Sequence, residues 1–278
     1  MIAKLLSELS TGIWAIRPEA AQGYMNLIVS YLKDPKNLSQ TDHSEDRKRC
    51  STLKVVSQAP DRTLMFSDAF KWDGTDKLDI PANSIVTIPV LDGITKYDQY
   101  CGPTGMQTVA ERVRMLDHHP NVAAIMLQID SPGGEGYAAR LMVDQLDQTN
   151  KPVIAFIDDL AASAAYMIAS ATDLIIANSD LAQIGSIGTY IPFASFDRKL
   201  ADQGIDFRPL YATASKDKNK TSADYFAGHT EEAQAMVDQF NESFLSSVEN
   251  TATDGCNVTA ANGEPVRCFP QRRPKKSA

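Results

Sequence analysis

The sequence is poor in the residues that bind metals and form disulfides. Its 278 residues include only four cysteines, none at a C-x-x-C spacing: Cys50, Cys101, Cys256 and Cys268. This pattern indicates no metal site. Free thiols in a reducing compartment are the expected state, with a Cys256–Cys268 bridge as the alternative. We therefore expect a protein that needs no metal and no cofactor.

Long apolar runs and an excess of positive charge are also missing. No apolar run approaches ~20 residues, so no integral membrane segment is expected. Met1–Leu9 contains a lysine, a glutamate and too short an apolar stretch for a secretion signal. The formal net charge is −8, which argues against nucleic acid as a partner because phosphates need clustered Lys and Arg. The basic cluster Arg267–Lys276 is interpreted as a solvated tail. These absences predict a cytoplasmic protein.

What remains is an ordinary globular composition, with 43% hydrophobic and 22% charged residues. Apolar residues at helical spacing after Pro18 predict an N-terminal helical extension over residues 1–33. Residues 34–62 are polar and lack periodicity, which predicts a linker or disordered loop. Residues 63–250 form the expected main domain. Residues 251–278 are rich in Gly, Asn, Pro and basic residues, and we expect a flexible tail.

The main domain alternates apolar strands with amphipathic helices. Strands are expected at Ile85–Val90, Val122–Ile129, Val153–Ile157, Leu174–Ala177 and Phe207–Tyr211. Helices are expected at Met106–Leu116, Ala138–Leu146, Ala162–Ala171 and Ser195–Leu200, and from Thr230 onward with the apolar face Ala233, Val237, Phe240, Phe244 and Val248. Such alternation predicts an α/β domain whose sheet is covered on its faces.

Two segments between strands and helices combine turn residues with a hydroxyl. Asp130–Gly134 carries a proline and two glycines, which suit a turn that presents bare N–H groups to an oxyanion; an ordinary tight turn is the alternative. In Leu160–Ala169, Ser163 follows a buried strand and begins a helix of small residues. A helix N-terminus stabilises negative charge near such a hydroxyl. The alternative is a common N-cap serine.

Two further segments are weak alone. Gly185–Gly188 is a glycine-rich turn with a second hydroxyl, Ser186, and Ser215–Lys220 is a lysine-rich run that usually indicates a solvated loop.

A serine nucleophile needs a base, and the sequence has only four histidines: His43, His118, His119 and His229. His43 lies in the predicted linker, whereas His118 and His119 end a predicted helix and suit its dipole. His229 directly precedes a helix cap, so none of the four closely follows Ser163. A lysine base is the more attractive candidate, although triad order varies among folds.

The four segments, in this order, resemble the signal peptide peptidase A (SppA) family of serine peptidases, which includes phage-encoded capsid-maturation members. The resemblance rests on Asp130–Gly134, Ala162–Tyr166, Gly185–Gly188, and Lys220 followed by Phe226 and Thr230. It covers roughly residues 84–250. It implies a fold like that of ClpP and crotonase proteins, built from repeated β-β-α units, and assembly into a homo-oligomer.

The resemblance also implies the site. Ser163 corresponds to the family's nucleophile and Lys220 to its general base, with Lys218 and Lys216 as runners-up. Gly133, Gly134 and Ala164 would supply the oxyanion N–H groups, and Ser186 would hold the lysine amine. The implied substrate is an extended polypeptide strand with small or apolar side chains, and in some relatives Ser and Lys come from neighbouring subunits.

The biological role implied by the resemblance is a phage one. We expect an endopeptidase of capsid (prohead) maturation or scaffold processing, in the bacterial cytoplasm or the prohead. The alternatives are a cytoplasmic membrane-associated signal-peptide peptidase, a crotonase-type acyl-CoA enzyme using Glu135, or an inactive relative. Ala164 and Ala165 stand where the family has glycines, and residues 251–278 do not resemble its closing strand–helix segment.

Overall fold

The computed structural model describes most of the predicted main domain, including a short strand at its start, and four short strands outside it. The described ranges are 80–99, 103–193, 195, 197–202, 204, 206, 210–215 and 217–250, together with β1 (Trp14–Ile16), β2 (Thr52–Val56), β3 (Arg62–Met65), β10 (Val258–Ala260) and β11 (Pro265–Val266).

Parallel strands form the centre of the sheet. β4 (Ser84–Leu91), β5 (Val122–Ser131), β7 (Val153–Ala162) and β8 (Leu174–Ala177) pair in the order β8-β7-β5-β4. One face of β5 is fully buried through Ile125, Leu127 and Ile129, whereas Met126 and Gln128 between them are half-buried. Apolar parallel strands joined by helices are typical of an α/β domain. The predicted α/β class is confirmed.

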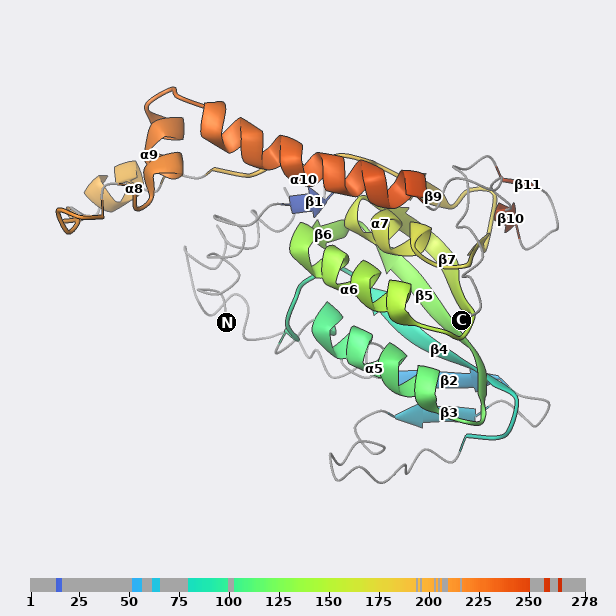
Figure 1. The fold of residues 1–278 in the computed structure, drawn as a ribbon. Coiled ribbons are helices and arrows are strands. Elements are labelled where there is room, and N and C mark those ends of the chain that lie inside the picture. The colour runs from blue at the N-terminus through green and yellow to red at the C-terminus, as the bar shows by residue number, and fades with distance from the viewer. Residues whose placement is uncertain are drawn as a thin grey trace.

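Helices connect these strands as the apolar spacing predicted. They are α5 (Met106–His118), α6 (Gly136–Gln148) and α7 (Ala164–Ser170). Figure 1 shows α5 and α6 side by side across the front of the sheet, with α7 next to α6. The buried residues of α5 are Met106, Val109, Ala110, Arg112, Val113 and Leu116. Each helix returns the chain so that β5 and β7 end at the same edge.

The sheet extends beyond the predicted domain at both sides. β2 pairs antiparallel with β4, and β3 with β2; at the other side β10 pairs parallel with β8, and β11 with β10. The prediction of a linker is therefore wrong at residues 52–56 and 62, and that of a structureless tail is wrong at residues 258–260 and 265–266. These strands are specified by backbone pairing with distant edges, which a local polar pattern does not reveal.

The N-terminal segment also differs from expectation. Trp14–Ile16, predicted as helix, is strand β1, which pairs antiparallel with β6 (Gly133–Glu135). The register places Trp14 opposite Glu135, Ala15 opposite Gly134 and Ile16 opposite Gly133. The rest of the predicted helical extension lies outside the described residues.

The C-terminal helices form an arm. α8 (Asp197–Asp202) and α9 (Lys220–Phe226) lie beyond the end of the sheet, at the left of Figure 1, and α10 (Glu231–Asn250) runs from them across α7. Of the predicted strand at 207–211, residues 207–209 lie outside the described part, and Leu210 and Tyr211 form no strand. α9 buries none of its residues. Within the described part of the chain, no helix combines the length and apolar character needed to span a bilayer.

Candidate active site

Ser163 lies where β7 turns into α7, in a backbone conformation that is strained for any residue but glycine. Its φ is 56° and its ψ is −117°. The residue stands at the N-cap position, yet its side chain makes no capping hydrogen bond. Ser163 is also only 1% exposed. A serine kept for capping would bond the first turn of the helix, so the N-cap alternative does not account for this hydroxyl.

The predicted Gly-Gly turn lies directly against Ser163. Gly133 has φ +98°, and a Cβ built on it would be 3.0 Å from the Cβ of Ser163. The buried Ser131 hydroxyl holds the turn, since its Oγ donates to the Asp92 carbonyl (2.5 Å) and accepts from the Gly133 N–H (3.2 Å). Only glycine fits here, because a side chain would collide with backbone atoms.

The third predicted motif completes the surroundings of the serine. The Ser163 N–H donates to the Gly185 carbonyl at 2.7 Å, and the Ser163 hydroxyl lies 3.4 Å from the Gly188 carbonyl. Ser186, between these glycines, has φ 56° and is exposed. A Cβ added at Gly185 or Gly188 would meet nothing within 4 Å. The space beside this turn is thus open, unlike the space beside Gly133.

Ala164 is the first residue of α7 and is fully buried. The first N–H groups of a helix have no partner within the helix. Three of the four predicted motifs therefore converge on Ser163.

The fourth motif is not brought to Ser163 within the chain. Lys220 begins α9 in the projecting arm, away from the start of α7 (Figure 1). Its side chain is 51% exposed, and Nζ lies 3.1 Å from Asp224 Oδ2. The hydrogen bond and charge of Asp224 raise the pKa of Lys220. Lys218 is exposed too, and Lys216 lies outside the described residues.

Other candidate bases lie elsewhere. His118 and His119 end α5, near the amino end of the sheet, and the His118 ring contacts the Arg114 carbonyl (2.7 Å). His229 is exposed in the arm, and His43 lies outside the described residues. Burial lowers the pKa of Lys151, but this residue precedes β7 whereas Ser163 follows it, roughly 30 Å away at the usual rise per residue.

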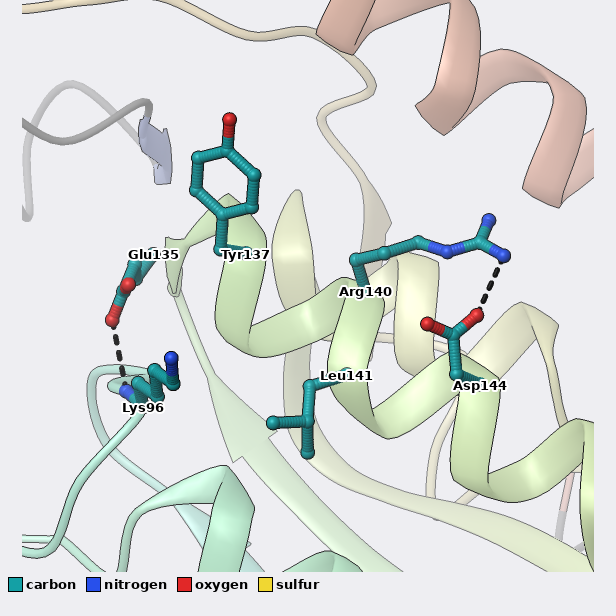
Figure 2. Close-up of a pocket in the computed structure, with 6 residues that line it drawn as sticks. All are labelled: Lys96, Glu135, Tyr137, Arg140, Leu141 and Asp144. Carbon is teal, nitrogen blue, oxygen red and sulfur yellow. Dashed lines mark hydrogen bonds and ion pairs between the residues drawn. The ribbon is translucent and has the colours of Figure 1, made fainter.

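Glu135, the acid required by the crotonase alternative, borders an open pocket of ≈ 590 Å³ (Figure 2). The other lining residues are Lys96, Tyr137, Arg140, Leu141 and Asp144. Glu135 Oε2 accepts the backbone N–H of Lys96 at 2.9 Å, and Arg140 pairs with Asp144 at 2.6 Å. The Glu135 carboxylate is thus bonded to the backbone of Lys96 at the start of α6. Among the described residues, no cluster of His, Cys, Asp or Glu could hold a metal ion.

Sequence reasoning missed two contributors to the site, Ser131 and strand β1. Ser131 was only part of a turn motif, and its bond to the Asp92 carbonyl spans 39 residues. β1 has a weak local signal, since the apolar triplet Trp14–Ile16 lies between Gly12 and Pro18. Gly and Pro often mark the turns that bound a short strand.

Comparisons with known proteins agree with the motifs. Residues 145–261 match the family model "Peptidase family S49". Protease 4 of Haemophilus influenzae is 30% identical over 58% of this chain and 26% of its own length. Head-tail preconnector protein GP5 of Enterobacteria phage P21 is 28% identical over 67% and 38%. Capsid assembly protease C of Escherichia phage lambda is 28% identical over 48% and 32%.

The chain thus spans only a quarter to two fifths of the length of these relatives, 26% to 38%. Among solved structures, a ClpP1 variant from Listeria monocytogenes aligns over 59% of this chain and 78% of its own, with 14% identity and a TM-score of 0.31. The matched segment 145–261 contains Ser163, Ser186 and Lys220. The resemblance inferred from the four motifs is therefore confirmed: residues 145–261 are similar to Peptidase family S49, and Protease 4 and phage capsid proteases are among the relatives of the chain.

Proposed function

We propose that this chain is a serine endopeptidase in which Ser163 is the nucleophile and Lys220 its general base. One observation carries the proposal: the Ser163 hydroxyl is held in a strained turn, makes no capping bond, and lies between two glycine turns. A positive φ at a non-glycine residue costs roughly 1–3 kcal/mol and persists mainly at functional sites. A strand-to-helix turn with this strain presents a nucleophile to its substrate.

The reaction follows from the groups around the hydroxyl. The neutral Lys220 amine takes the proton of Ser163 while Oγ bonds to the peptide carbonyl carbon. The carbonyl oxygen becomes an oxyanion, stabilised by the N–H groups of Gly134 and Ala164, with Gly133 beside them. Protonated Lys220 then gives its proton to the leaving amine as the C–N bond breaks. In the second half of the reaction Lys220 takes a proton from water as the water oxygen bonds to the acyl carbon. Lys220 then returns the proton to Ser163 Oγ as the ester bond breaks and the product acid leaves.

The base requires a change of environment. Within one chain the amine is exposed and paired with Asp224, which raises the pKa of Lys220 and keeps it charged at neutral pH. A general base must be neutral, and burial away from carboxylates is what lowers the pKa of a lysine. We therefore propose that Lys220 enters the site of a second copy of the chain.

Three features support this arrangement. The arm that carries Lys220 has no buried residue in α9 and exposes Tyr225 (38%) and Phe226 (51%). Exposed aromatic residues are enriched at protein interfaces. The space beside Gly185 and Gly188 is open in the single chain, and Ser186 offers a hydroxyl there to hold an amine. Lys218 and Lys216 remain the alternative bases on the same loop.

The proposed biological role is proteolysis during phage capsid (prohead) maturation, in the host cytoplasm or inside the prohead. Two of the relatives carry phage head or capsid names, "Head-tail preconnector protein GP5" and "Capsid assembly protease C". The alternative role is that of host enzymes such as "Protease 4". Portal and capsid genes flanking the gene for this chain would favour the phage role.

Mixing two inactive variants tests both the dyad and the copy that supplies each residue. Ser163→Ala should lower casein hydrolysis by ~10³-fold or more, and Lys220→Met by a similar factor. Chains of the two variants, refolded together, should recover activity in about one site in four, because only statistical pairing of an intact serine with an intact lysine restores a site. Lys218→Met is the matched control and should keep its activity.

The outcomes separate the claims. Full activity of Lys220→Met would exclude Lys220 as the base, and loss of activity in Lys218→Met would transfer the role to that residue. Failure of the mixture to recover, with both single variants inactive, would place the dyad within one chain. Full activity of Ser163→Ala would end the peptidase proposal.

A further inference from the structure

The strand edge beside Ser163 is occupied by the chain's own N-terminal segment. We propose that Trp14–Ile16 occupies this edge as a peptide substrate would, so that the segment competes with substrates in cis and closes the site until it is displaced. The competition with substrates presupposes the proposed peptidase function. The position of Trp14–Ile16 beside β6 is given by strand pairing and does not depend on that function.

The first argument comes from the two edges of β6. On one side, the Ile94 N–H donates to the Gly133 carbonyl (2.9 Å) and the Glu135 N–H donates to the Ile94 carbonyl (2.8 Å). Peptide groups alternate in direction along a strand. The N–H and carbonyl of Gly134 therefore point to the other side, where Ala15 is its partner in the antiparallel register. A predicted oxyanion donor thus faces β1.

The second argument is proximity to the nucleophile. A Cβ built on Gly133 would be 2.3 Å from the Ala15 carbonyl oxygen and 3.0 Å from the Ser163 Cβ. One point beside Gly133 is therefore within 3.0 Å of both residues. β1 also contacts α7, the helix that Ser163 begins. The Ala15 peptide group consequently lies where a peptide held on β6 would meet the serine.

The third argument is that the nucleophile is closed off. Ser163 is 1% exposed, and a serine this covered cannot receive a polypeptide unless something moves. The candidate that moves is β1, because among the described strands it pairs with β6 alone, whereas β6 is also bonded to Ile94 and the strand that ends at Gly185 pairs with β7. Displacing β1 would free the same edge of β6 that a substrate strand needs.

The chemistry of the occupant indicates the chemistry of the substrate. Ala15 is fully buried and Ile16 is 3% exposed, so the edge accepts a small residue followed by an aliphatic one. A bulky or charged residue at the position of Ala15 would have no room or would lose its water. The same requirement applies to a peptide that takes the place of β1.

A charged substitution in β1 tests the competition. In the full-length Ala15→Asp chain, β1 should leave the edge, and labelling of Ser163 by a fluorophosphonate probe should accelerate about tenfold, since the rate scales with the fraction of open sites. Thr11→Asp puts the same charge three residues before the strand and should label at the wild-type rate. A folded Ala15→Asp chain that labels no faster than wild type would overturn the inference.

Because Ala15 is buried, the substitution can also unfold the chain, so hydrogen exchange gives a second reading. A synthetic peptide of residues 10–20 (STGIWAIRPEA) is added in excess to the Ser163→Ala chain, which cannot cleave it. Exchange at residues 14–16 should rise as the peptide displaces β1, whereas a peptide with aspartate in place of Ala15 should have no effect. Unchanged exchange with the first peptide would overturn the inference. If the peptide displaces β1 but Ser163 is never labelled by the fluorophosphonate probe, the proposed peptidase function is wrong, and peptide binding at the edge of β6 is still supported.

Discussion

The two halves of the proposed site are built in opposite ways. The serine half is made by the sheet: Ser163 is buried, its N–H is bonded to Gly185, and the Gly133 turn lies against it. The lysine half lies on an arm whose helix α9 buries nothing, with Lys220 exposed and paired with Asp224. A strained nucleophile needs a rigid scaffold, whereas a neutral lysine needs to lose its water. One chain supplies the first condition, and in the proposed assembly a second copy would supply the second.

The largest loss of turnover is expected when a methyl group is added to the serine half of the site, beside the sheet. In Gly134→Ala, the new Cβ would lie 2.0 Å from the Ile94 carbonyl oxygen, so β6 must shift. The Gly134 N–H would then lose its position, and turnover should fall by ~10²–10³. Steady-state hydrolysis of casein measures this effect.

The matched control is a glycine of the arm. Gly204 also has a positive φ, +73°, but a Cβ there would meet nothing within 4 Å. Gly204→Ala should cost roughly 1–2 kcal/mol of local strain and leave turnover within about twofold, as for surface changes away from a site. Equal losses in both variants would mean that the sheet half is no more constrained than the arm.

A smaller effect is expected from the aromatic residues of the arm. Phe193 stacks on Tyr225 with ring centres 3.9 Å apart, and Phe226 packs edge-on against Tyr225 at 5.6 Å. Phe226→Ala should weaken self-association about tenfold or more, because buried aromatic anchors dominate interfaces. The free energy of unfolding of the chain should change by no more than about 0.5 kcal/mol. Sedimentation velocity and thermal unfolding measure the two quantities.

Leu181→Ala provides the comparison for that variant. Leu181 is 80% exposed and lies between β8 and β9 (Gln183–Gly185). Its loss should leave self-association unchanged. If Leu181→Ala weakens assembly while Phe226→Ala does not, the second copy docks on the sheet and not on the arm, and Lys220 loses its route to the site.

The sequence predicted the centre of the fold well because local pattern and tertiary role coincide there. In β5, a run of apolar residues is both a strand signal and the middle of the core. At the edges of the sheet, local sequence pattern and tertiary role no longer coincide. β2 and β10 lie in segments without a strong periodic signal and are strands because a distant strand offers its free backbone groups. Trp14–Ile16 was predicted as helix for the same reason, since its partner β6 lies more than a hundred residues away.

The site divides in the same way. Glycine turns and a serine after a buried strand are local features, and their convergence follows from parallel strands ending at one edge of the sheet. The strain at Ser163 and the bond from Ser131 to the Asp92 carbonyl depend on contacts far apart in the chain. In the single chain Lys220 pairs with Asp224, four residues further on. In the proposed assembly its surroundings would come from a second copy, and no pattern within one sequence specifies that contact.

The smallest expected effect concerns that pKa. In Asp224→Asn the ion pair to Lys220 is lost, and because Asp224 raises the pKa of Lys220, its removal lowers that pKa. A larger fraction of the amine is then neutral at a given pH, so the rise of activity with pH should begin at a lower pH. Asp217→Asn should shift the profile in the same direction but less, since Asp217 contributes least to the raised pKa. The measurement is the pH dependence of kcat/KM for each variant. A profile that Asp224→Asn leaves unmoved would mean that the active assembly has already separated Lys220 from Asp224, and a shift to higher pH would contradict Lys220 as the base.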